Sequence, residues 1–265
     1  MPRILQITDT HLVAPPALVS GRLDTAALLG ETIDHIAAVL PMIAPVDALL
    51  VTGDISDDGS AESYATFRRL VEPLGLPILP IPGNHDLRGP MRTAFSDLNL
   101  FPPAGRLNWM TEIDGLKIVG IDTLVEGAGG GVVDDATLAF LEAELAQEGP
   151  VLLAMHHPPF LSGIRFMDGI GLEGIDRLKG VLEASKAEIR IVCGHLHLMA
   201  TGSVGRIPAI VGPSSCSTFR TDFRPDAPVG FFTGSGGFMV HDWSDGFRSV
   251  AIPRANALGE GSFAF

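Results

Sequence analysis

The chain has 265 residues, of which 46% are hydrophobic, and its 31 acidic and 18 basic residues give a formal net charge of −13. This length suits one large domain or two small ones, with enough apolar residues for a sizeable core. The acidic balance argues against broad electrostatic attraction to nucleic acid or to anionic lipid. It does not argue against an anionic substrate, because bound cations can reverse the local charge.

Three features of the sequence predict a cytoplasmic protein. With only Cys193 and Cys216, a disulfide framework is not expected, which fits a reducing compartment. The apolar stretches are strand-length and interrupted, so we expect none to reach the roughly 18 residues of a membrane span. The first residues enter an apolar strand pattern without a basic region or a small-residue cleavage site, so we expect no secretory signal.

Short apolar runs alternate with amphipathic stretches. Buried strands are predicted at residues 3–8, 47–53, 76–83, 116–122, 150–155 and 188–194. Apolar residues at helical spacing predict helices at residues 24–40, 60–74, 134–147 and 174–184. Asp134 is a plausible N-cap, and the Asp-Gly pair within residues 112–118 predicts a hairpin.

After residue 200 the helical pattern fades, and short strands are predicted at 205–212, 229–234, 237–243 and 247–253. We therefore predict one layered α/β domain over residues 1–265, whose late strands extend or cover the sheets. The phenylalanines at 231 and 232 and near the C-terminus could serve the core, a dimer contact or a substrate platform. A homodimer or a larger homo-oligomer is thus left open.

Polar side chains follow five of the predicted strands, just past the apolar run. They are Asp9 and His11; Asp54; Asn84 and His85; His156 and His157; and His195 and His197. In α/β sheets this edge is where ligands bind. Each group alone is more often a turn than a site, but five independent turns would not be expected to repeat the same residue types.

These residue types also indicate a class of metal. Imidazole combined with carboxylate and amide oxygen suits Fe, Zn, Mn or Co, whereas calcium prefers oxygen alone and structural zinc is rich in Cys. Seven protein ligands are too many for one catalytic ion that keeps an open position. They suit two ions that share a carboxylate.

Together, the five blocks over residues 9–197 resemble the calcineurin-like metallophosphoesterases. Within that superfamily the chain is most similar to the bacterial class III cyclic nucleotide phosphodiesterases and the related glycerophosphodiesterases. Residues 83–86 (GNHD), 155–159 (MHHPP) and 194–197 (GHLH) carry the resemblance. Residues 166–174 resemble the active-site rim less closely, and the chain after about residue 200 matches only loosely. The resemblance implies a four-layer α/β/β/α sandwich.

The resemblance also implies a role for each site residue. The first ion would be held by Asp9, His11, Asp54 and His197. Asp54 would bridge to the second ion, which would be completed by Asn84, His156 and His195. His85 would contact the phosphate or the leaving group, and Asp86 could orient it.

One departure from the resembling protein phosphatases concerns the substrate. They carry an Arg that clamps a phosphate monoester at the position of Asp58, and a Glu at the position of Asp86. Loss of a cation and gain of an anion favour a singly charged diester over a doubly charged monoester.

The leading interpretation is an enzyme that hydrolyses a small phosphodiester, preferably a 3′,5′-cyclic nucleotide, by attack of a metal-bridging hydroxide. Hydrolysis of glycerophosphodiesters or of several diesters is the alternative. A nuclease is disfavoured by the low number of basic residues, and a non-catalytic scaffold should lack ligands, of which none is missing here.

The remaining polar residues near these motifs have plainer interpretations. His157 is expected to make a structural hydrogen bond, His35 to be solvated or partly buried on a helix, and His241 to be structural. Solvated loops would explain the acidic residues Asp57, Asp58 and Asp168.

Overall fold

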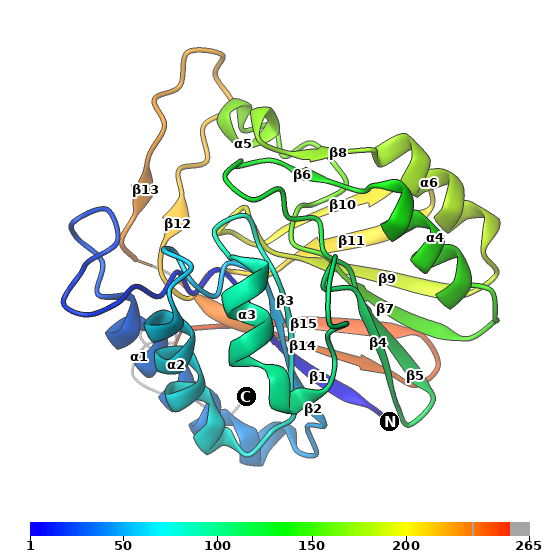
Figure 1. The fold of residues 1–265 in the computed structure, drawn as a ribbon, viewed down its shortest axis with the longest axis horizontal. Coiled ribbons are helices and arrows are strands. Elements are labelled where there is room, and N and C mark those ends of the chain that lie inside the picture. Colours follow the sequence, from blue (N-terminus) through cyan, green and yellow to red (C-terminus); the bar gives the residue numbers. More distant parts are fainter. Residues whose placement is uncertain (235, 255–265) are drawn as a thin grey trace, which may run out of the picture.

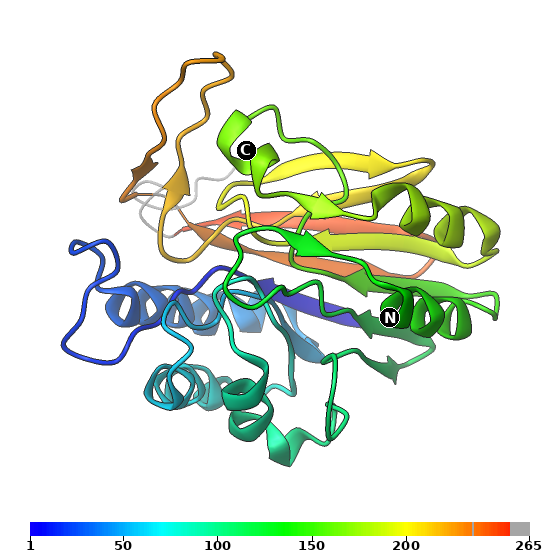
Figure 2. The ribbon, with the colours of Figure 1, turned by 45° about the horizontal axis from the view of Figure 1, so that its top comes forward.

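The computed structural model describes residues 1–234 and 236–254. Its centre consists of two mixed sheets that lie face to face, with helices on the outer side of each (Figures 1 and 2). The C-terminal phenylalanines at 263 and 265, whose role the sequence left open, lie outside the described residues.

The first sheet has the strand order β15-β14-β1-β2-β3. Its strands are β1 (Arg3–Ile7), β2 (Ala48–Thr52), β3 (Ile78–Ile81), β14 (Gly237–Trp243) and β15 (Phe247–Pro253). Strands β1, β2 and β3 are parallel, whereas β14 and β15 are added antiparallel at the edge next to β1. The helices on its outer side are α1 (Thr25–Ile43), α2 (Ala61–Val71) and α3 (Arg88–Ala94). Short 3₁₀ turns follow at η1 (Glu72–Leu74) and η2 (Ser96–Leu98).

The second sheet has the strand order β10-β11-β9-β7-β5-β4. Its strands are β4 (Trp109–Ile113), β5 (Leu116–Gly120), β7 (Pro150–Ala154), β9 (Glu188–Cys193), β10 (Ala200–Val204) and β11 (Ile207–Val211). Its outer side is covered by α4 (Asp135–Glu144) and α6 (Ile175–Ala184). A short helix, α5 (Arg165–Gly169), and two small two-stranded sheets lie near the ends of the strands. These pairs are β6 (Gly131–Val132) with β8 (Leu172–Glu173), and β12 (Thr218–Phe219) with β13 (Phe231–Phe232).

Three clusters of buried apolar side chains hold these layers together. One joins the helices α1, α2 and α3 to the first sheet, and another joins α4 and α6 to the second sheet. The third lies between the sheets, where Leu50 of β2 and Leu152 of β7 are fully buried. This arrangement confirms the predicted four-layer α/β/β/α sandwich.

The local signals in the sequence explain where the main elements begin. Asp24, Ser60 and Asp134 each cap a helix by accepting a hydrogen bond from the backbone N–H three residues later. The β4–β5 hairpin turns through Asp114 and Gly115, which both have positive φ, as a tight Asp-Gly turn requires. The six early strands, four helices and four late strands predicted from the sequence all correspond to observed elements, and the predicted hairpin accounts for β4. The short elements α3, α5, β6, β8, β10 and β12 were not predicted.

One expectation about membranes was wrong. Helix α1 is, by length and composition alone, long and apolar enough to cross a membrane. In the fold, however, Leu29, Ile33 and Ile36 of this helix are buried in the cluster that joins it to the first sheet.

Candidate metal centre

The predicted site residues meet at the ends of β1, β2 and β3 on one sheet and of β7 and β9 on the other. The loops after β1 and β2 are joined by hydrogen bonds from Asp9 N to Gly53 O (3.1 Å) and from His11 N to Asp54 O (2.9 Å). The two sheets are joined here by His156 Nδ1, which donates to Thr52 O at 2.8 Å. Chain segments far apart in the sequence are thereby brought to one point.

An unusual backbone conformation aims several of these side chains. Among the described residues, eight other than glycine have positive φ, and five of the eight are predicted ligands. These five are Asp9, His11, Asp54, His195 and His197. Left-handed residues held in place by their surroundings cluster at functional sites, so the strain itself singles out this region.

Glycines let the backbone approach the two carboxylates closely. A Cβ atom on Gly83 would lie 2.2 Å from Asp54 Oδ1, and one on Gly194 would lie 2.9 Å from Asp9 Oδ2. Any side chain at either position would therefore displace a carboxylate. The glycines of the GNHD and GHLH motifs are thus explained by the space around the site.

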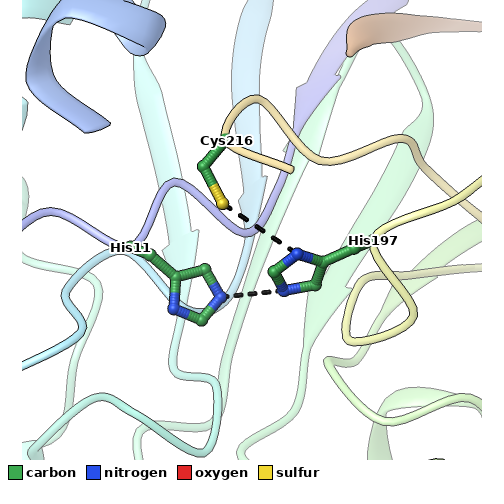
Figure 3. Close-up of side chains that lie close together, drawn as sticks. All are labelled: His11, His197 and Cys216. Carbon is green, nitrogen blue, oxygen red and sulfur yellow. Dashed lines mark hydrogen bonds between the residues drawn. The ribbon is translucent and has the colours of Figure 1, made fainter. Parts of the chain in front are cut away.

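The first group of ligands contains Asp9, His11, Asp54 and His197. The Nε2 atoms of His11 and His197 lie 2.9 Å apart (Figure 3). Asp54 Oδ2 is 3.4 Å from His11 Nε2, and Asp9 Oδ1 is 3.6 Å from His197 Nε2. Four atoms that could bind a metal ion therefore face one small volume.

The opposite edges of the two imidazoles indicate which nitrogen carries the proton. His11 Nδ1 lies 2.8 Å from the Asp57 carboxylate, which can only accept when ionised. His197 Nδ1 lies 3.0 Å from Ser217 Oγ, which can accept in the same way. With both protons on Nδ1, the Nε2 lone pairs point at each other. A cation between them would turn this repulsive contact into coordination.

The second group contains Asn84, His156 and His195, with Asp54 shared between the groups. His156 Nδ1 and His195 Nε2 donate to the backbone carbonyls of Thr52 and Ile170, so in the neutral rings, the form that binds a metal, the other nitrogens carry the lone pairs. His156 Nε2 is 3.2 Å from Asp54 Oδ2, and His195 Nδ1 is 3.0 Å from Asn84 Oδ1. Here too, atoms able to accept face one another.

The charges of the site favour bound cations. Burial alone would raise the pKa of Asp54, but the imidazoles of His156 and His11 hold it well below its usual value. Burial raises the pKa of Asp9 to about 6. Although burial disfavours a charged imidazole, Asp54 raises the pKa of His156 to about 9. Buried carboxylates thus stabilise positive charge here, and the donor set fits Fe, Mn, Zn or Co.

His85 lies at the open edge of the centre. Its backbone N–H donates to Asp54 Oδ1 at 2.9 Å, and its side chain remains 41% exposed. His85 Nδ1 is 3.2 Å from Asp57 Oδ1. Burial alone would lower the pKa of His85, but Asp57 and Asp54 raise it to about 9. His85 is therefore protonated at neutral pH and accessible from outside.

Asp86 does not make the contact expected of it. Its buried carboxylate accepts hydrogen bonds from Gly83 N (2.8 Å), Ser56 N (3.0 Å), Ile55 N (3.2 Å) and the Tyr64 hydroxyl (3.0 Å). These bonds fasten the loop after β2 to the loop after β3. The contact with the His85 imidazole is instead made by Asp57.

Asp57 is a functional residue that the sequence analysis missed, because its place in an acidic loop indicated only solvation. One carboxylate oxygen lies 2.8 Å from His11 and 3.2 Å from His85. These hydrogen bonds outweigh burial and lower the pKa of Asp57. Its position three residues after Asp54, in the same loop, was the available signal.

The other two acidic residues also accept hydrogen bonds from backbone amides, although Asp58 is exposed and Asp168 is only half-buried. Asp58 accepts from Ala14 N and Ser60 N, at 3.0 and 2.9 Å. Asp168 accepts from Ser162 N and Gly163 N, at 2.7 and 3.0 Å, and so shapes the loop before α5.

The remaining histidines behave as expected. The buried His157 contacts Thr123 Oγ1 (2.8 Å) and donates to Gly129 O (3.2 Å), and burial lowers its pKa to about 3. His241 is buried between Ser249 and Gln6, at 2.8 Å from each. His35 is half-buried on α1, where its Nε2 lies 3.0 Å from Pro253 O and its ring contacts that of Phe238.

The loop after β11, which contains Ser214 and Ser217, contacts the first group of ligands. Ser214 Oγ donates to the backbone carbonyl of Asp9 at 2.9 Å, and Ser217 Oγ contacts His197. Cys216 Sγ is 3.9 Å from His197 Nδ1 (Figure 3), and burial raises the pKa of this thiol to about 12. The thiol therefore stays neutral. The sequence did not predict this support because the segment lacks a metal-ligand spacing.

A cavity of about 610 Å³ opens beside His195. Its walls include Gly130 and Gly131 of the loop and strand β6, Leu161, and Ile170. Most of the lining is apolar or backbone, so the cavity could receive an uncharged organic group next to the second group of ligands.

Comparison with known proteins places these observations in a family. A model of the calcineurin-like phosphoesterase family matches residues 2–199. A probable glycerophosphodiester phosphodiesterase GpdQ of Arcobacter nitrofigilis is 30% identical, over 91% of this chain and 89% of its own length. The 3′,5′-cyclic adenosine monophosphate phosphodiesterase CpdA of Pseudomonas aeruginosa is 31% identical, over 94% and 85%. The cAMP/cGMP dual specificity phosphodiesterase MT0825 of Mycobacterium tuberculosis is 31% identical, over 98% and 82%.

Solved structures share the fold at low sequence identity. GAP50, the anchor in the inner membrane complex of Plasmodium, aligns with a TM-score of 0.62 at 12% identity, over 96% of this chain and 85% of its own. TT1561 of Thermus thermophilus aligns with a TM-score of 0.56 at 13% identity, over 88% and 98%. The chain belongs to the calcineurin-like phosphoesterase family, which confirms the family and the enzyme class expected from its motifs.

Proposed function

We propose that this protein is a dinuclear metal-dependent phosphodiesterase. The observation that carries the proposal is the convergence of imidazole lone pairs around one shared carboxylate. Asp54 Oδ2 lies 3.4 Å from His11 Nε2, which meets His197, and the same oxygen lies 3.2 Å from His156 Nε2. The first ion would be held by Asp9, His11, Asp54 and His197, and the second by Asp54, Asn84, His156 and His195.

Two transition-metal ions would lower the pKa of water to near neutrality and neutralise charge on the phosphate. The chain's own residues would then complete the reaction. Asp54 fixes the spacing of the two groups, and the backbone N–H of His85 holds Asp54 in turn. None of the seven proposed ligands is a lysine or an arginine, so fixed positive charge at the centre would come from the ions.

His85 is the proposed general acid. It keeps its proton at neutral pH because its pKa is raised to about 9, and it lies at the accessible edge of the site. A leaving alkoxide requires a proton as its bond to phosphorus breaks. Asp57 contacts Nδ1 of both His85 and His11. It therefore positions the His85 imidazole and links this proton donor to the first group of ligands.

The proposed substrate is a small phosphodiester, preferably a 3′,5′-cyclic nucleotide. This choice rests on the relatives named as cAMP and cAMP/cGMP phosphodiesterases and on the absence of a basic side chain at position 58. A glycerophosphodiester or several diesters is the second candidate, supported by the relative named GpdQ. A cytoplasmic location without nucleic-acid or membrane binding, and assembly into homo-oligomers, remain predictions from the sequence.

The test is hydrolysis by protein stripped of metal and reloaded with Mn²⁺, Fe²⁺, Zn²⁺ or Co²⁺. We expect metal-dependent cleavage of cyclic AMP and cyclic GMP, with slower cleavage of glycerophosphodiesters. A metal-loaded protein that cleaves only glycerophosphodiesters would favour the second candidate. A protein that binds metal and cleaves none of them would contradict the proposal.

A further inference from the structure

Two phenylalanine rings stack on each other at the rim of the metal centre. Phe166 belongs to α5 and Phe219 to β12, and their rings are nearly parallel, with centroids 5.8 Å apart and an interplanar angle of 10°. We call this pair the aromatic wall. Phe166 is 44% exposed, although a phenylalanine gains most when it is fully buried. Its position therefore needs an explanation other than core packing.

The aromatic wall begins at a proposed metal ligand. The ring of Phe219 lies edge-on to the imidazole of His197, with centroids 6.4 Å apart and an angle of 80°. Phe166 stacks on Phe219 and so extends the wall by one further ring. A substrate whose phosphate lies at the centre would have the wall within reach of its organic part.

Several contacts hold the wall in place. Helix α5 and the arm that carries β12 and β13 lie side by side in both views (Figures 1 and 2). Arg165, next to Phe166, donates to Pro225 O of the arm at 2.7 Å. The ring of Phe223 lies against Gly163, where a Cβ atom would approach it to 3.1 Å. The wall is therefore built from two chain segments that are tied together rather than from one free loop.

We propose that the aromatic wall stacks the base of a nucleotide substrate. This inference rests on the proposed function and names the part of the substrate that the wall would recognise. Stacking of a base on an aromatic ring needs a flat face and no specific hydrogen bond, so adenine and guanine would both be accepted. A glycerophosphodiester has no base and would gain nothing from the wall.

The cavity beside His195 is the competing location for the base. It lies on the side of the second group of ligands, whereas the wall adjoins His197 of the first group. Its lining offers mainly aliphatic side chains and backbone. Leu161, which lines the cavity and is 76% exposed, provides a variant that alters the cavity and leaves both rings of the wall intact.

The test compares Phe166→Ala with Phe166→Trp, Leu161→Ala and Phe232→Ala in the metal-loaded protein. Phe232 is an exposed phenylalanine of the same arm that does not belong to the wall, so it controls for general changes of the arm. For Phe166→Ala we expect KM for cyclic AMP and cyclic GMP to rise about 5- to 150-fold, the range for loss of one base–aromatic stack. The KM for glycerophosphoethanolamine should not change, and Phe166→Trp should restore nucleotide binding.

A binding measurement separates this inference from the proposed function. Calorimetric titration should show that Phe166→Ala weakens binding of AMP and leaves binding of inorganic phosphate unchanged. Equal losses for both ligands, or an effect of Leu161→Ala in place of Phe166→Ala, would overturn the role of the wall. A wild-type protein that binds AMP through Phe166 but hydrolyses no diester would contradict the proposed function and support the wall.

Discussion

His11 and His197 face each other through their Nε2 atoms at 2.9 Å, while their Nδ1 atoms are engaged by Asp57 and Ser217. Both rings come from strained loop positions with positive φ, and they belong to opposite sheets of the sandwich. When both rings are neutral with their protons on Nδ1, the fold thus holds two lone pairs in a contact that a cation between them would make favourable.

Removal of the Ser217 hydroxyl should weaken metal binding at the first site. The His197 ring would lose the partner that fixes its proton on Nδ1, and such outer partners are typically worth about 10- to 100-fold in metal affinity. Ser217→Ala should show this loss in a calorimetric Mn²⁺ titration, and Ser217→Thr should largely avoid it. Unchanged affinity together with a lower unfolding temperature of the metal-free protein would mean that Ser217 only supports the fold.

The loss of activity on replacing His85 should depend on the leaving group of the substrate. General acid catalysis is typically worth about 10²- to 10⁴-fold, and it matters most for a poor leaving group. His85→Ala should therefore slow cleavage of a cyclic nucleotide much more than cleavage of bis(p-nitrophenyl) phosphate, because nitrophenolate leaves without a proton. Both metal ions should be retained, which metal analysis would check.

Replacing Asp57 and Asp86 in turn should distinguish a residue that positions His85 from one that stabilises the fold. Asp57→Asn should show a milder version of the same leaving-group bias and a lower pH for loss of activity, because Asp57 raises the pKa of His85. Asp86→Asn should instead lower thermal stability, since its carboxylate joins two loops through buried hydrogen bonds. A leaving-group bias in Asp86→Asn without a stability loss would restore the role first expected for Asp86.

Diesters should be cleaved with higher kcat/KM than the matching monoesters. A monoester carries a second negative charge, and this site has Asp58 where the resembling phosphatases have an arginine. The Asp58 carboxylate is bound by backbone amides, so we assign the preference to the missing cation rather than to the charge of Asp58. A faster reaction with p-nitrophenyl phosphate than with its bis-ester would refute this preference.

The buried His241 should make the protein sensitive to acid. Burial lowers its pKa to about 3, so in the folded state it stays neutral while the unfolded chain protonates below about pH 6.5. The unfolded state then binds more protons, and stability falls as the pH decreases from about 6.5 toward 3. One such group contributes a slope of about 1.4 kcal/mol per pH unit.

This slope can be measured by denaturant unfolding of the metal-free protein between pH 4 and pH 7. His241→Gln should be less stable at pH 7, since it disturbs the contacts with Gln6 and Ser249. Its stability should nevertheless depend less on pH than that of the wild type. A His241→Gln slope equal to that of the wild type would contradict the assignment.

The sequence predicted the sandwich and the meeting of the motif residues because both depend on regular patterns. Strand periodicity and helix caps such as Asp134 specify elements locally, and parallel strands bring their ends to one edge. The roles of Asp57 and Ser217 could not be predicted in this way. Both act through contacts with imidazoles from other parts of the chain, and an acidic loop or a serine-rich turn has no periodicity that reports such a partner.

Short elements escaped prediction for a related reason. Helix α5 has five residues, and β6, β8 and β12 have two each, so no period can be established within them. Their arrangement depends on tertiary contacts such as the stacking of Phe166 on Phe219. The rim that would select the substrate is therefore the part of the site least readable from sequence.

The central claim, a two-ion centre bridged by Asp54, is tested most directly by metal stoichiometry in wild type and Asp54→Ala. Asp54 Oδ2 lies 3.4 Å from His11 Nε2 and 3.2 Å from His156 Nε2, so loss of this carboxylate should disturb both groups of ligands. Stripped wild-type protein titrated with Mn²⁺ should bind two ions per chain, and cyclic AMP hydrolysis should reach its maximum only after the second equivalent. Asp54→Ala should bind both ions more weakly and lose activity. Full activity with a single ion, or an Asp54→Ala protein that keeps two ions and its activity, would contradict the account.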